Sequence, residues 1–114
     1  MKKLTKEQYD NVIKAIDLAQ DAGKCNYVLN NGSPCCVIGQ LIHLEGDEIK
    51  LVAITRERIN HVLETVKLPN ISKYDVSFLY HLQLMWDEVS FCAGFSEDDI
   101  KHKMKTYVDS CRKL

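Results

Sequence analysis

Apolar residues recur along most of the chain with the spacing of an amphipathic α-helix. The stripes predict five helices, over residues 6–22, 35–45, 56–67, 73–90 and 97–112. The stripe of residues 73–90 is apolar on more than one face, which is typical of a helix at the centre of a domain. Residues 47–54 fit a strand or a loop equally well. The pattern therefore predicts an all-α or nearly all-α fold of about five helices in a single domain, residues 1–114.

Three of the helices begin with the signature of a capping box, in which a hydroxyl and a side chain three residues later exchange hydrogen bonds with the backbone. The pairs are Thr5 with Gln8, Ser72 with Asp75, and Ser96 with Asp99. Ser33, followed by a proline, is the predicted cap of helix 35–45, and Thr55 that of helix 56–67. Gly23 is the predicted terminator of the first helix.

The segment between the first two helices contains Asn31-Gly32, a strong turn signal that favours a short β-hairpin near residues 26–36. A hairpin this small is stable only when it packs on something. It packs either on its own helices or on a partner chain. We expect the second, with Tyr27, Val28, Leu29 and Asn31 as contacts to a protein partner.

The composition limits the class of protein. Of the 114 residues, 46% are hydrophobic and 27% are charged, and the net charge is −1, which is the balance of a globular domain rather than a disordered one. Nucleic acid is a poor candidate partner because no basic footprint is visible. The sequence has neither the apolar core of a signal peptide nor a run long enough to span a membrane. We expect a soluble cytoplasmic protein.

Five cysteines, an odd number without an export signal, predict free thiols in a reducing compartment. Their spacing to one another and to the four histidines fits no usual zinc site, so we expect no metal and no cofactor. Cys35 and Cys36 fall in the predicted first turn of a helix, where the helix dipole lowers a thiol pKa. A thiol nucleophile also needs a base. None of the histidines stands at a diagnostic spacing.

Four residues are candidates for a structural polar clamp: Cys36, Gly39, Gln83 and Asp87. Gln83 and Asp87 are four residues apart on one helix face. We expect them to hydrogen-bond to backbone donors at the start of helix 35–45. Gly39 costs about 1 kcal/mol relative to Ala inside a helix. Close approach of helix 73–90 is the expected compensation.

Two segments resemble a group of small bacterial and phage proteins. Residues 36–41 read Cys-Val-Ile-Gly-Gln-Leu, and residues 82–87 read Leu-Gln-Leu-Met-Trp-Asp. The group has a Cys-Ala-Ile-Gly-x-Leu helix start followed later by a Leu-Gln-x-x-Asn-Asp helix. This chain departs from it at Val37 and Trp86. The resemblance implies a helical fold and a phage or mobile-element setting, and it transfers neither an activity nor site residues.

Three functions remain open at this point. The leading hypothesis is a non-catalytic interaction module. Its most concrete version is a phage-encoded, anti-CRISPR-like inhibitor of a host or defence protein in the host cytoplasm. The second is a binder of a small ligand, with a pocket between helices 35–45 and 73–90. The third is a thiol enzyme that uses Cys35 or Cys36.

Overall fold

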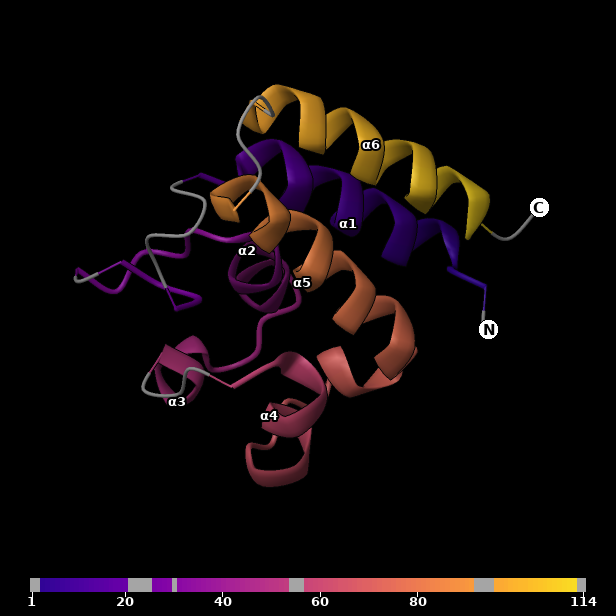
Figure 1. Ribbon diagram of the computed structural model, residues 1–114. Helices are drawn as coiled ribbons and strands as arrows, with labels where there is room; N and C mark the ends of the chain where they lie inside the picture. The colour runs from indigo at the N-terminus through magenta and orange to yellow at the C-terminus, as the bar shows by residue number, and fades with distance from the viewer. Residues whose placement is uncertain (1–2, 21–25, 30, 54–56, 92–95, 113–114) are drawn as a thin grey trace.

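The computed structural model describes residues 3–20, 26–29, 31–53, 57–91 and 96–112. Its elements in chain order are α1 (Lys6–Leu18), α2 (Val37–Leu44), α3 (Ile49–Ala53), α4 (Ile59–Thr65), the 3₁₀ turn η1 (Ile71–Lys73), α5 (Val76–Phe91) and α6 (Glu97–Ser110) (Figure 1). The described residues form isolated β-bridges but no strand. The predicted all-α class with about five helices is confirmed. The ambiguous segment 47–54 contains a sixth, short helix.

The helices pack as a bundle around α2. α1 packs on α2 and α6, while α5 packs on α2, α4 and α6. Figure 1 shows α1 and α6 side by side and antiparallel. Every residue from Val37 to Ile42 is buried. The centre of the domain is therefore α2. The apolar surface of α5, predicted to be central, is divided among three neighbouring helices.

Two of the three predicted capping boxes are confirmed. The hydroxyls of Thr5 and Ser96 accept the backbone N–H three residues later, and the side chains of Gln8 and Asp99 accept the N–H of the cap residue. Both signatures are entirely local. A helix begins at such a site because its orphan backbone donors find acceptors within one turn.

The third predicted box, at Ser72, is wrong. The chain makes only a 3₁₀ turn there, and Tyr74 is extended, so α5 begins at Val76. The Ser72 hydroxyl donates backwards to the carbonyl of Leu68 at 2.7 Å. The carboxylate of Asp75 instead accepts the N–H of Ser77 at 2.8 Å, as a residue at a helix start does.

The other predicted helix ends are also shifted. α2 begins two residues later than expected, because Pro34 pairs with Val28 and the backbone is still extended at Cys36. Cys36 rather than Ser33 is its cap. α1 ends at Leu18, and the predicted terminator Gly23 and cap Thr55 lie outside the described residues. No helix in the described part of the chain is long and apolar enough to cross a membrane.

Candidate functional site

A small loop, which we call the arm (residues 26–29 and 31–34), projects from the helices between α1 and α2 (Figure 1). Leu29 N–H donates to Ser33 O at 2.8 Å, and Cys35 N–H donates to Tyr27 O at 3.1 Å. Gly32 occupies the turn with a φ of 86°, a conformation that glycine adopts without strain. The predicted hairpin thus forms as a tight turn held by isolated pairing rather than as two strands.

Tyr27 is the anchor of the arm. Its side chain is 2% exposed, and its hydroxyl donates to Glu57 O at 2.6 Å and accepts from Gln83 Nε2 at 2.9 Å. Burial raises the pKa of this phenol to about 12. The backbone of Tyr27 has a φ of 74°, which is strained for an aromatic residue. Tyr27 was expected to touch a partner, but its ring lies in the core of its own domain.

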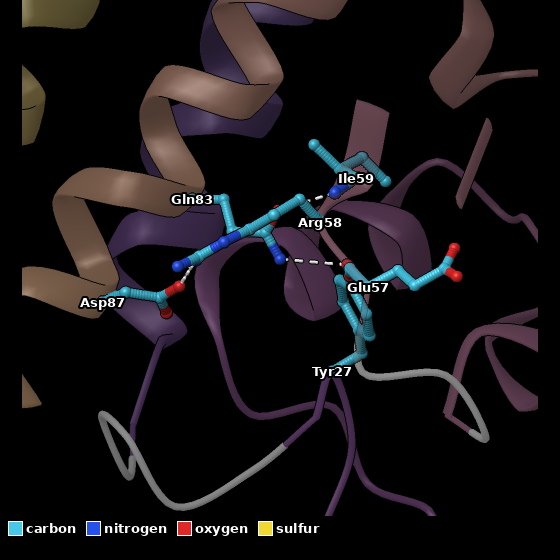
Figure 2. Close-up of polar contacts among 6 residues, drawn as sticks. All are labelled: Tyr27, Glu57, Arg58, Ile59, Gln83 and Asp87. Carbon is cyan, nitrogen blue, oxygen red and sulfur yellow. Dashed lines mark hydrogen bonds and ion pairs between the residues drawn. The ribbon is translucent and has the colours of Figure 1, made fainter. Parts of the chain in front are cut away.

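Gln83, on α5, joins the arm to the start of α4. Its Oε1 accepts the backbone N–H of Ile59 at 2.7 Å, while its Nε2 donates to the hydroxyl of Tyr27 (Figure 2). The residue at the N-cap position of α4, Arg58, makes no side-chain cap hydrogen bond. Gln83 therefore supplies from another helix an acceptor that the α4 start lacks.

The polar clamp predicted for Gln83 and Asp87 exists, but it holds a different element. The expected target was the start of helix 35–45, and the observed target is the start of α4. Asp87 forms an ion pair with Arg58, one turn along α5 from Gln83 (Figure 2). Both partners are partly exposed, at 40% for Arg58 and 32% for Asp87, so the pair contributes little to stability on its own. The role of the pair is to orient the segment that precedes α4.

Gly39 also meets the arm rather than a helix. A Cβ atom on Gly39 would overlap the carbonyl oxygen of Tyr27 and come within 2.9 Å of the carbonyl carbon. The expected close approach is present, but the partner is the backbone of the arm and not helix 73–90. Glycine inside α2 therefore has a steric reason that outweighs its poor helix propensity.

The base of the arm is fixed by Gln40, which the sequence did not single out. Its side chain is buried, and Nε2 donates to Pro34 O at 3.0 Å and to Leu18 O at 3.2 Å. Arg58 and the Glu57 carbonyl are likewise parts of the site that sequence reasoning missed. No local pattern marks any of them, because each acts on a residue more than five positions away.

The two candidate thiols have structural roles. Cys36 Sγ accepts the N–H of Gly39 at 3.3 Å as the cap of α2, and burial raises the pKa of its thiol. Cys35 is fully buried and disulfide-bonded, with its partner outside the described residues. The expectation of five free thiols is thus wrong for Cys35. All four histidines lie at exposed positions. This geometry does not favour a thiol nucleophile.

The tip of the arm carries the remaining predicted contacts. Asn31 is exposed, and Val28 and Leu29 are half-buried. The Asn31 side chain accepts the N–H of Ser33 at 2.9 Å, which fixes the turn. Residues 25–44 contain no Asp, Glu, Lys or Arg. The arm is therefore an uncharged projection on a chain whose surface is otherwise rich in charge.

Two clefts lined by described residues lie away from the interface between α2 and α5, where a ligand pocket was expected. A polar cleft of about 350 Å³ lies between the start of α1, the end of α2 and η1. A more apolar one of about 430 Å³ follows α4, along residues 63–69. Among the described residues, no group of three or more His, Cys, Asp or Glu could hold a metal ion.

Comparison with protein-family models, with curated proteins and with solved structures finds no match. The resemblance to small phage proteins stays a prediction.

Proposed function

We propose that this protein is an interaction module that presents the arm to another protein. The observation that carries this proposal is the strained backbone of Tyr27, at a φ of 74°, in a residue whose ring is buried. Such strain costs on the order of 1–3 kcal/mol and persists only where the surroundings over-determine it. Here hydrogen bonds from Gln83, Cys35 and the Tyr27 hydroxyl itself hold the arm in one shape.

A loop held in one shape before binding loses less conformational entropy when it binds. Val28, Leu29 and Asn31 are the proposed contacts. Tyr27 holds them in place, because its buried ring anchors the arm to the domain. The lack of charge along the arm suits this role, because the centres of protein interfaces are depleted of charged residues.

The more specific version is a phage-encoded inhibitor of a host or defence protein, acting in the host cytoplasm. It rests on the sequence resemblance of residues 36–41 and 82–87. The disulfide at Cys35 weighs against the cytoplasmic part, because disulfides persist in oxidising compartments. The arm proposal does not depend on the compartment.

Quantitative affinity capture from a lysate of the source cells tests the arm. Asn31→Trp places a bulky ring at the exposed tip, and Lys14→Ser changes an exposed residue on α1 as the matched control. We expect Lys14→Ser to retain a captured protein that Asn31→Trp binds at least about tenfold more weakly, a loss of about 1.4 kcal/mol. Equal capture by both variants, with unchanged thermal unfolding, would exclude the arm as the contact surface.

A further inference from the structure

The polar cleft between α1, α2 and η1 contains charged side chains that the fold does not use for ion pairs. Glu7 is on the first turn of α1, Glu45 follows α2, and Lys73 ends η1. In the described part of the chain, none of the three forms a salt bridge. The rest of the lining is mainly amide and hydroxyl groups, including Gln8 and Asn70.

Glu45 is held in a fixed orientation by neutral donors. One carboxylate oxygen, Oε1, accepts from Asn11 Nδ2 at 2.8 Å and from the Tyr74 hydroxyl at 3.1 Å. The backbone carbonyl of Glu45 accepts from Asn70 Nδ2 at 2.8 Å. The other carboxylate oxygen accepts no hydrogen bond from the described residues. A carboxylate positioned in this way is prepared to receive one further donor from a ligand.

Glu7 lies near the same place. The pKa of Tyr74 is raised by burial first, then by the charge of Glu45 and its hydrogen bond, and also by the charge of Glu7. Both carboxylates thus act on one phenol, that of Tyr74, which donates a hydrogen bond to Glu45. With Lys73, the formal charges in the cleft are two negative and one positive.

We propose that the polar cleft binds a free basic α-amino acid such as arginine or lysine. Such a molecule carries two cations, the α-ammonium group and the side chain, and one carboxylate, the complement of the cleft. The cations would bind at Glu45 and Glu7, and the carboxylate at Lys73. A volume of about 350 Å³ lies within the range of small-molecule sites. The proposal is independent of the arm, which is a different part of the molecule.

Titration of the full chain with L-arginine at constant ionic strength, followed by amide NMR shifts, tests the site. We expect saturable shifts at Asn11, Glu45 and Asn70. L-citrulline lacks the side-chain charge and agmatine lacks the carboxylate, so each should bind at least about tenfold more weakly. N-acetyl-arginine keeps the side-chain cation and the carboxylate but lacks the α-ammonium group, so it should also bind more weakly than free arginine. Equal binding by the two would indicate a site for a peptide C-terminus and would overturn the two-cation assignment.

Variants localise the site. Glu45→Gln keeps an acceptor for Asn11 and Tyr74 but removes the charge, and Lys73→Met removes the exposed cation. Each should weaken arginine binding about tenfold, whereas Glu64→Gln, the same charge change in the cleft after α4, should not. Lys73 is exposed, so Lys73→Met remains informative if Glu45→Gln does not fold. Absence of saturable shifts up to about 10 mM arginine, or equal binding by Lys73→Met and Glu64→Gln, would overturn the proposal.

Discussion

The α-carbon of Gly39 lies against the carbonyl group of Tyr27, so that α2 and the arm meet backbone to backbone. No side chain separates the two segments at this point. The contact fixes the distance between the arm and the most buried helix of the domain. On the arm it is made by Tyr27, the residue with the strained backbone. Any side chain at position 39 therefore acts on the arm before it acts on the helix bundle.

Gly39→Ala should destabilise the protein by about 1–3 kcal/mol through overpacking. On helix propensity alone, the same change would stabilise it by about 1 kcal/mol. The clash with a backbone carbonyl decides the sign of the change in unfolding free energy, because backbone atoms cannot move aside as a flexible side chain can. Urea unfolding measures the difference, with Lys14→Ala on the exposed face of α1 as a control expected to be nearly neutral. A stabilised Gly39→Ala protein would contradict the contact.

Gln83→Leu should cost about 1–3 kcal/mol, because it leaves both Ile59 N–H and the Tyr27 hydroxyl without this partner. Gln20→Leu, a change of the same type at an exposed position, should have a much smaller effect. A double-mutant cycle with Tyr27→Phe isolates the direct pair, and we expect a coupling of about 0.5 kcal/mol or more. Strict additivity of the two changes would show that the Gln83–Tyr27 hydrogen bond does not contribute.

Stability should fall as the pH rises above 10 in a way that depends on Tyr27. The folded chain ionises this phenol at a pKa of about 12, against an ordinary value of 10.0. Below pH 10 both states keep the proton and the full stability is present. Between these values only the unfolded chain loses the proton, so stability decreases by up to about 1.4 kcal/mol per pH unit.

Denaturant unfolding at about pH 9 and about pH 11 measures this loss. Tyr27→Phe, although less stable overall, should lose less stability over the same interval than the wild-type chain. Tyr74 also has a raised pKa and is retained in both proteins, so it cancels in the comparison. An identical pH dependence in the two proteins would place the phenol of Tyr27 in water.

Alkylation of the unreduced, unfolded chain followed by peptide mass spectrometry should recover Cys35 in a disulfide and Cys36 and Cys111 as alkylated thiols. The map also identifies the partner of Cys35. Recovery of five alkylated cysteines would instead support the fully reduced state that the sequence analysis expected from the odd number of cysteines.

The features that the sequence predicted correctly are short in range. The boxes at Thr5 and Ser96 depend on atoms three residues apart, and the turn at Gly32 depends on one backbone conformation. Amphipathic stripes likewise placed all five long helices, although their ends moved by up to four residues. The capping box predicted at Ser72 from the same local signature was wrong, because the Ser72 hydroxyl donates to the carbonyl of Leu68, four residues earlier in the chain.

The candidate site was predicted only in part. Gln83, Asp87 and Gly39 were recognised as residues that need an explanation, but their partners were misassigned. Gln83 reaches Tyr27 across 56 positions and Ile59 across 24, and no periodic pattern encodes such pairings. An aromatic residue beside a turn is equally compatible with a core and with an interface. Burial at Tyr27 is decided by the packing of α2, α4 and α5 around it.

The two ends of the described chain lie side by side and are joined by a backbone hydrogen bond. Leu4 N–H donates to Cys111 O at 3.0 Å, and α6 returns antiparallel along α1 (Figure 1). Force applied at these ends would load that bond first and then peel α6 from α1 one turn at a time, because the helices separate from a shared end. The arm, on the opposite side of the molecule, lies outside this load path. Single-molecule pulling should therefore show a low-force step before the anchor at Tyr27 yields, and a single cooperative rupture would exclude this order.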